Sequence, residues 1–234
     1  MRTEILVTDL KNVFRDKSLW LIFALPLFVT LILRFLPPIY ESYFPEALNY
    51  RPLILGFFCL LASTLAGFLL AFVMLDEKDQ QLFEVFSITP LNLKGLLKYR
   101  IGLMTVLGAV FAFLIAEFSG LVDLHFFQAL GIALSCSLAA PINTLFIVGL
   151  ANNKIEGVTY YKLANFILII PLIGMFLSGP LKYVFGVIPF FWIYLGVDTL
   201  SSPVYSMCSF GAAFLGQLVL VMLAIRYFNK RNFK

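Results

Sequence analysis

The sequence predicts an all-α membrane protein with six transmembrane helices, built as one domain over residues 1–234. Hydrophobic residues make up 61% of the chain and charged residues 13%, whereas soluble domains average roughly 45–50% and roughly 25%. Apolar segments close to the roughly 20 residues that cross a hydrocarbon core recur along the chain. The predicted spans cover about residues 19–36, 53–75, 101–121, 127–150, 160–179 and 205–227.

Residues 1–18 are predicted to form an amphipathic helix that lies along the membrane surface before the first span. Leu6, Leu10 and Phe14 recur at helical spacing on one face, while Asp9 and Lys11 fall on other sides. A plain positively charged flank is the alternative.

The first two spans carry an arginine and a set of small residues. Arg34 lies near the end of span 19–36, where an arginine can reach the headgroups. Span 53–75 contains Ser63-x-x-x-Gly67 and Ala62-x-x-x-Ala66, a spacing that lets another helix approach closely. We expect a helix contact on this face.

Span 101–121 contains Glu117, a carboxylate about one turn from the outer end. An acid at this depth is either a structural or interfacial group, or a group involved in substrate passage. Arg34 should lie at a similar depth, so we predict that Arg34 and Glu117 form an intramembrane pair.

Span 127–150 concentrates polar residues around a proline. Ser135, Asn143 and Thr144 lie close to Pro141, which removes a backbone donor and favours a kink. The pattern fits either a bent structural helix or a polar lining of a transport pathway, and the sequence leaves both open. Span 160–179 also has a central proline, Pro171.

The segment before the last span is too short to cross. Its apolar run at 183–197 is broken by Pro189, and a helix of this length reaches roughly 22 Å against a core of roughly 30 Å. We predict an outer hairpin of two short re-entrant or interfacial helices over 180–204.

The distribution of positive charge predicts the orientation. Of the 17 Lys and Arg residues, only Arg51 and Lys182 fall on the predicted outer side, with Arg34 in the membrane. Positively charged loops stay in the cytoplasm, so both termini are expected there.

Residues 76–100, between the second and third spans, form the largest polar segment. Its acids and apolar residues alternate in a way that suits a short helix at a membrane surface or in a partner's groove. Thr89 and Pro90 can cap and start a second helix. The residues that we single out are Asp76, Glu77, Asp79, Leu82, Phe83, Glu84, Phe86, Thr89 and Pro90. A charged loop that only sets topology is the alternative.

Several kinds of chemistry have no motif in the sequence. The chain contains no Gly-Lys dipeptide and so no P-loop of the Gly-x-x-x-x-Gly-Lys type. It has no His-Glu-x-x-His or Gly-x-Ser-x-Gly, and its single histidine and isolated cysteines have no metal-ligand spacing. We expect no catalytic residue, no metal and no nucleic-acid partner, and any ATP must bind to another chain.

The residue pattern of this loop resembles that of a known family. Leu75-Asp76-Glu77-Lys78-Asp79, then Leu82-Phe83-Glu84, Thr89-Pro90-Leu91 and Lys98-Tyr99-Arg100, resembles the loop between the second and third spans in permease subunits of type-2 ATP-binding-cassette (ABC) exporters. It is nearest to the small bacterial permeases that export fluoroquinolone-type drugs. In that family the loop docks on the ATPase as a coupling helix.

The resemblance implies a permease subunit of a multi-pass exporter in the bacterial inner membrane. Its expected partners are two copies of an ABC ATPase, which would carry the ATP and Mg, and a second permease copy or a paralogue. The expected substrate is an amphipathic or hydrophobic drug, lipid or peptide. The alternative is a non-transporting membrane protein, such as a lipid-modifying enzyme or an immunity or scaffold factor.

Overall fold

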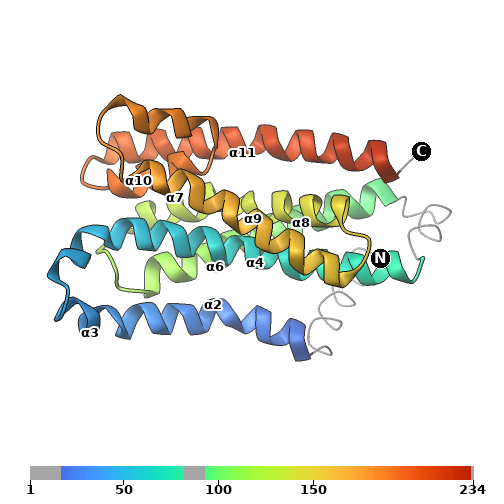
Figure 1. Cartoon of the computed structure of the whole chain (residues 1–234), viewed down its shortest axis with the longest axis horizontal. Helices are drawn as coiled ribbons and strands as arrows, with labels where there is room; N and C mark the ends of the chain where they lie inside the picture. The colour runs from blue at the N-terminus through green and yellow to red at the C-terminus, as the bar shows by residue number, and fades with distance from the viewer. Residues whose placement is uncertain (1–16, 82–92, 233–234) are drawn as a thin grey trace.

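The computed structural model describes residues 17–81 and 93–232. These residues form a bundle of helices that run along one common axis (Figure 1). Six helical segments in this part of the chain are long and apolar enough to cross a membrane, which confirms the predicted all-α protein with six transmembrane helices. Residues 1–16 of the predicted interfacial helix and residues 82–92 of the predicted coupling loop lie outside the described residues.

The described residues form both long and short helices. In chain order they are α2 (Lys17–Phe35), α3 (Pro37–Glu41), the 3₁₀ helix η1 (Pro45–Tyr50), α4 (Arg51–Asp79), α6 (Leu93–Phe118), α7 (Phe126–Ser137), α8 (Ala139–Leu150), α9 (Lys154–Gly174), the 3₁₀ helix η2 (Pro180–Val187), α10 (Phe191–Asp198) and α11 (Pro203–Asn232). We call the end of the bundle where α4 ends and α6 begins the loop end. The opposite end, with α3, η2 and α10, is the hairpin end.

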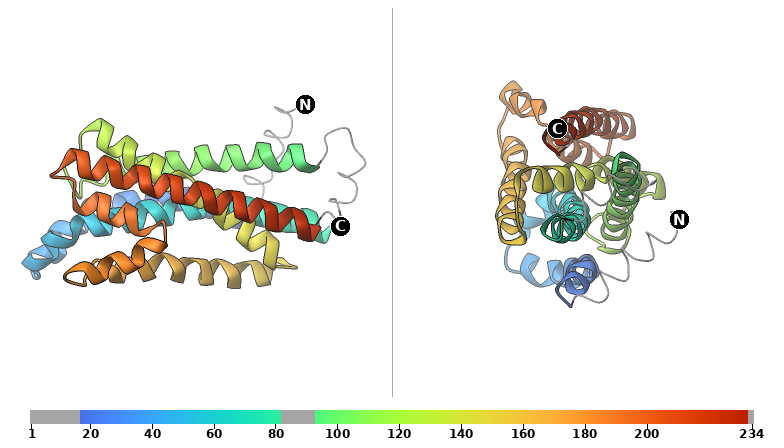
Figure 2. Two further views of the ribbon diagram at one scale, coloured as in Figure 1. Left: turned by 90° about the horizontal axis from the view of Figure 1, so that it is seen from above. Right: turned by 90° about the vertical axis from the view of Figure 1, so that its right-hand side faces the viewer.

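Helix α4 lies at the centre of the bundle. It packs against α2, α6, α7, α8, α9 and α10, and the end view in Figure 2 shows neighbours on all of its sides. Most of its residues between Leu55 and Leu75 are buried. A helix that is apolar on all sides needs this position, since any exposed side would otherwise require polar residues or lipid. A displacement of α4 therefore reaches most of the bundle.

The small residues of α4 contact α7 and α8 within the same chain. A Cβ added at Gly67 would lie 2.1 Å from the carbonyl oxygen of Ala140, so the two backbones are in direct contact. The hydroxyl of Ser63 donates to the carbonyl of Cys136 at 2.7 Å. Helix α6 meets the same point, because a Cβ at Gly108 would lie 2.6 Å from the Ser63 oxygen. The helix contact expected from Ser63-x-x-x-Gly67 is thus an intramolecular crossing.

The predicted span 127–150 consists of α7 and α8, which are separated at Leu138. Pro141, one turn further on, has no N–H for the helical bond to the preceding turn. Neighbouring helices supply donors to the carbonyls at this break: the amide of Gln217 on α11 donates to the carbonyl of Ser135 at 2.6 Å. The kink expected at Pro141 is therefore a break that α4 and α11 stabilise.

Helix α9 begins and ends earlier than the predicted span 160–179. Its start is fixed by Asn153, whose side chain accepts a hydrogen bond from the Glu156 N–H, a standard N-cap. Because the first turn of α9 is charged, a search for apolar segments does not detect where the helix begins. At the other end Gly174 lies against the ring of Phe185, since an added Cβ would be 2.7 Å from it, and the chain turns back into η2.

The hairpin at 180–204 contains the two short helices that were predicted. Tyr194 of α10 is fully buried, and its hydroxyl donates to the carbonyl of Leu168 on α9 at 3.1 Å. Burial raises the pKa of the Tyr194 phenol, which therefore stays protonated as a donor. On its other side α10 touches α4, because a Cβ at Gly56 would lie 3.0 Å from Val197. Helix α10 thus packs into the bundle, whereas η2 has no buried residue and lies at its surface.

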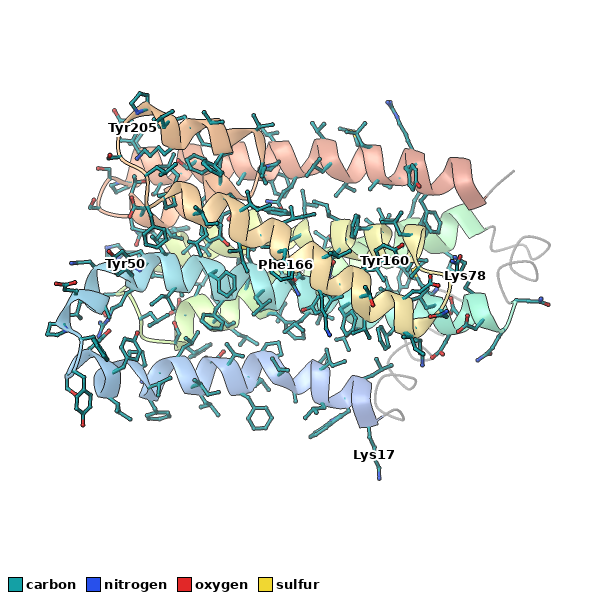
Figure 3. The ribbon with its side chains drawn as sticks, viewed as in Figure 1. Lys17, Tyr50, Lys78, Tyr160, Phe166 and Tyr205 are labelled. Atoms are coloured by element: carbon teal, nitrogen blue, oxygen red, sulfur yellow. The ribbon has the colours of Figure 1, made fainter. Side chains whose placement is uncertain are left out.

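The outer face of the bundle is apolar between two polar ends. Lys17 and Lys78 lie at the loop end, and Tyr50 and Tyr205 lie at the hairpin end (Figure 3). Between them large apolar side chains point outward, such as Phe166, which is 65% exposed. Soluble monomers rarely expose apolar surface on this scale, whereas such a band suits contact with lipid.

Candidate functional site

The loop end is held together by an ion pair between α4 and α6. The guanidinium of Arg100 binds the carboxylate of Glu77 with two bonds, Nη1 to Oε2 and Nη2 to Oε1, each 2.5 Å long. Parallel bonds of this kind fix orientation as well as distance. The two residues are 23 positions apart, so the pair closes the base of the predicted coupling loop.

Two further contacts bind the same turn of α4 to the segment between α8 and α9. The ammonium of Lys154 lies 2.7 Å from the carboxylate of Asp76. The ammonium of Lys78 donates to the carbonyl of Ala151 at 2.8 Å. We call the contacts made by Asp76, Glu77 and Lys78 the brace. The brace joins the ends of α4 and α8 to the beginnings of α6 and α9.

The two ion pairs of the brace differ in how deeply their side chains are buried. The side chain of Arg100 is 3% exposed and that of Glu77 is 13% exposed, whereas Lys154 and Asp76 are 34% and 42% exposed. Removing one partner of a buried pair costs about 3–5 kcal/mol, whereas an exposed pair contributes about 0–1 kcal/mol. The Arg100–Glu77 pair therefore provides most of the rigidity of the brace.

Some of the predicted coupling residues lie in the described part of the chain and the others lie outside it. Asp76 and Glu77 belong to the brace. Asp79 directly follows the brace residue Lys78, and its side chain is exposed. The remaining predictions lie outside the described residues, namely Leu82, Phe83, Glu84, Phe86, Thr89 and Pro90.

The partner of Glu77 was missed by reasoning from the sequence. The signal was available: Arg100 is surrounded by Leu96, Leu97 and Ile101 at the start of an apolar helix. A cation in such a position needs a counter-charge.

The polar residues near Pro141 bind backbone carbonyls. The hydroxyl of Thr144 donates to Gly67 O at 2.8 Å, and that of Ser135 donates to Ile132 O at 2.8 Å. Both residues are buried. For Ser135 and Thr144 these contacts favour the bent structural helix over the pathway lining.

Asn143 differs from its two polar neighbours. Its Nδ2 donates to Thr64 O at 2.8 Å, which also fixes which amide atom is the oxygen. Its Oδ1 is buried and has no hydrogen-bond partner among the described residues. Of the three predicted lining residues, Asn143 thus keeps a free polar atom, and its place in a pathway stays a prediction.

Arg34 and Glu117 lie at the same end of the bundle, as expected, but the guanidinium has another partner. Its Nη1 donates to the carbonyl of Phe118 at 3.1 Å. Within the described part of the chain no ion pair joins Arg34 to Glu117, whose side chain is exposed. The last carbonyls of α6 have no partner within the helix, and Arg34 binds one of them.

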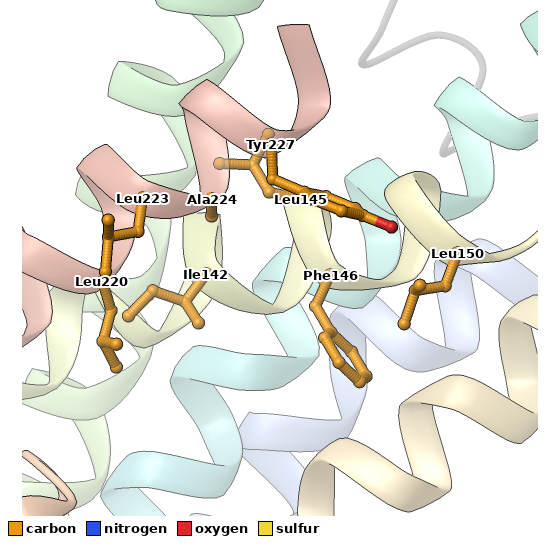
Figure 4. Close-up of a pocket in the computed structure, with 8 residues that line it drawn as sticks. All are labelled: Ile142, Leu145, Phe146, Leu150, Leu220, Leu223, Ala224 and Tyr227. Carbon is orange, nitrogen blue, oxygen red and sulfur yellow. The ribbon is translucent and has the colours of Figure 1, made fainter. Parts of the chain in front are cut away.

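Two neighbouring cavities lie beside α8. The larger has a volume of about 410 Å³ and lies between α8 and α11; its wall runs from Ile142 to Leu150 on one side and from Leu220 to Tyr227 on the other (Figure 4). We call it the α8–α11 groove. The smaller, of about 150 Å³, lies between α4, α8, α9 and α11 and is lined by Asn143 and Thr64 among apolar residues. We call it the inner cavity.

A bundle of six membrane-length helices with polar ends defines a multi-pass membrane protein. The chain belongs to the fluoroquinolone export permease family, because the model of the family "Fluoroquinolones export permease protein Rv2686c-like" matches residues 9–227. The resemblance to the small fluoroquinolone-export permeases is thereby confirmed. Family membership makes the chain a permease subunit of an exporter, a transport protein and not an enzyme.

Two curated relatives are similar over most of their length. They are the "Fluoroquinolones export permease protein" MT2760 of Mycobacterium tuberculosis strain CDC 1551 / Oshkosh and the protein of the same description, Rv2686c, of strain ATCC 25618 / H37Rv. Each is 29% identical over 192 residues, which cover 79% of this chain and 76% of the relative. No solved structure matches the chain significantly.

Proposed function

We propose that the chain is the membrane-spanning subunit of an ATP-driven ABC exporter in the bacterial inner membrane, with both termini in the cytoplasm. Two copies of a separate ATPase would bind ATP and Mg, and a second permease copy or a paralogue would complete the channel. The substrate is an amphipathic or hydrophobic molecule. The printed names of the relatives make fluoroquinolones the first class to test.

The brace is the observation that carries this proposal. A loop that only set topology would not need its base clamped by a buried, bidentate ion pair, since such a pair is costly to assemble. A loop that receives force from a partner does need a rigid base. The Arg100–Glu77 pair supplies it directly at α4, the central helix.

Charge supports the orientation. Lys78, Arg100 and Lys154 gather at the loop end, and the sequence adds the positive residues of both chain termini to the same side. Positive residues concentrate in the cytoplasm. The loop end would then face the compartment that contains ATP.

The mechanism that follows is mechanical. ATP-driven closure of the ATPases would push on residues 76–100, and the brace would pass the displacement to α4 and α6 together. Helix α4 touches α8 at Gly67, just beyond the break at Leu138, where the absence of an N–H on Pro141 would make bending easier. The displacement would therefore change the angle between α7 and α8.

Purification of the tagged chain from its native membrane tests the proposal. We expect an ATPase to copurify, with a hydrolysis rate in lipid nanodiscs that is stimulated by the permease. Changing Phe83→Ala together with Glu84→Arg in the loop should return the rate to that of the ATPase alone. Val187→Ala at the hairpin end, where Val187 is 87% exposed, is the control and should leave the rate unchanged. Absence of an ATPase, or full stimulation by the loop variant, would contradict the proposal.

A further inference from the structure

The inner cavity contains a buried acceptor that the protein leaves unused. Asn143 is 3% exposed and lines this cavity, and no described residue donates to its Oδ1. Buried polar atoms in native proteins nearly always have a partner, and an exception calls for an explanation. The explanation cannot be a reversed amide, because Nδ2 already donates to Thr64 O. A donor from outside the chain fits the site.

The inner cavity lies next to the α8–α11 groove. Ile142, Phe146 and Leu220 line both the inner cavity and the α8–α11 groove, so the two spaces adjoin. The groove extends from there to Leu150 and Tyr227, at the loop end of the bundle (Figure 4). Its walls are almost entirely apolar. A molecule dissolved in the leaflet at the loop end could therefore move along the groove and reach Asn143 without crossing water.

The two volumes set the shape of the occupant. Sites for drug-sized ligands have roughly 300–1,000 Å³, so the groove, at about 410 Å³, is large enough for the apolar body of such a molecule. The inner cavity, at about 150 Å³, holds only a small group. An acyl chain fills the groove equally well but has nothing to donate to Asn143.

We propose that the α8–α11 groove and the inner cavity together form the site at which the exporter takes its substrate from the inner leaflet, with Asn143 Oδ1 accepting a hydrogen bond from an N–H or O–H group of the substrate. The proposal rests on the proposed function and adds to it a location, an entry side and a required donor group. Asn143 is the specificity-determining residue, and the groove supplies the apolar contacts.

Binding of norfloxacin, an intrinsically fluorescent fluoroquinolone with an amine N–H, to the purified full-length chain in nanodiscs tests the proposal. Asn143→Leu should weaken binding about tenfold or more, because the donor loses its buried acceptor. Thr144→Val is the matched control: it also removes one side-chain bond to the α4 backbone, but no unpaired acceptor, and should bind within about twofold of the wild type.

A second pair of variants tests the groove without touching Asn143. Ala224→Phe fills the groove from α11 and should weaken binding about tenfold or more. Val219→Phe also introduces a phenyl ring into α11, but on its outer face, where Val219 is 51% exposed, and should have no effect. Thermal unfolding of each variant identifies any that fail to fold.

The outcomes separate this proposal from the proposed function. No binding by the wild type, or unchanged binding in Asn143→Leu or Ala224→Phe, overturns the site, whatever the stimulation of the ATPase shows. Dissociation of a permease dimer by Ala224→Phe would assign the groove to a second copy and would also overturn it. Conversely, the binding effects could be as expected while no ATPase copurifies. That result would overturn the proposed coupling to an ATPase but would support the substrate site.

Discussion

Replacing Gly67 by alanine is expected to destabilise the protein more than other single methyl additions. The added Cβ would lie 2.1 Å from the oxygen and 2.9 Å from the carbon of the Ala140 carbonyl group. Both are backbone atoms, so α4 and α8 must separate, and the Thr144 hydrogen bond to Gly67 O weakens with them. Overpacking costs roughly 1–3 kcal/mol and sometimes more, and we expect about 3 kcal/mol or more here.

Thermal unfolding in detergent measures this effect, with Gly102→Ala as the control. Gly102 lies in α6, and a Cβ there meets no atom within 4 Å. Alanine is the better helix former by about 1 kcal/mol, so the control variant should be as stable as the wild type or slightly more stable. Equal stability of Gly67→Ala and Gly102→Ala would show that α4 and α8 do not touch as described.

Changing Arg100→Met should have the second large effect. It leaves the carboxylate of Glu77, 13% exposed, without the guanidinium that binds it. Breaking a buried pair in this way costs about 3–5 kcal/mol. Lys154→Met breaks the exposed pair with Asp76 and should cost less than about 1 kcal/mol.

A double-mutant cycle is the appropriate measurement, because it isolates the interaction between two residues. Unfolding free energies for Glu77→Leu, Arg100→Met and the double variant should give a coupling of a few kcal/mol, on the order of the cost of a broken buried pair. The same cycle for Asp76 and Lys154 should give a value near zero. Equal coupling in the two cycles would mean that Arg100–Glu77 is an ordinary surface pair and not the base of the loop.

Much of the fold follows from the sequence because a bilayer imposes simple rules. Apolar length predicts the crossings, and the short run around Pro189 predicts a hairpin that does not cross. Pro141 predicts a disturbed helix. Helix α9 begins before the predicted span, because Asn153 caps the helix ahead of a charged turn, and hydropathy detects only the apolar part of a helix.

The pairing of polar groups was much harder to predict. The sequence shows that Arg34, Arg100 and Glu117 are charged residues in apolar surroundings, but the partner of each depends on how the helices are rotated. Arg34 donates to the Phe118 carbonyl and not to the neighbouring Glu117 carboxylate. Arg100 finds its acid 23 positions away across a loop. Asn143 could be marked as polar, but only the surrounding helices reveal that one of its atoms is unpaired.

The most direct test of the proposed coupling to an ATPase is to determine on which side of the membrane the brace lies, because an ATPase can act only on a cytoplasmic surface. A membrane-impermeant maleimide applied to intact cells and to inside-out vesicles measures it, with Cys208→Ser removing the exposed native cysteine. Cysteine at Gln80, exposed after α4, should react only in inside-out vesicles, and cysteine at Val187 only in intact cells. Labelling of Gln80→Cys in intact cells would place the brace outside and contradict the account.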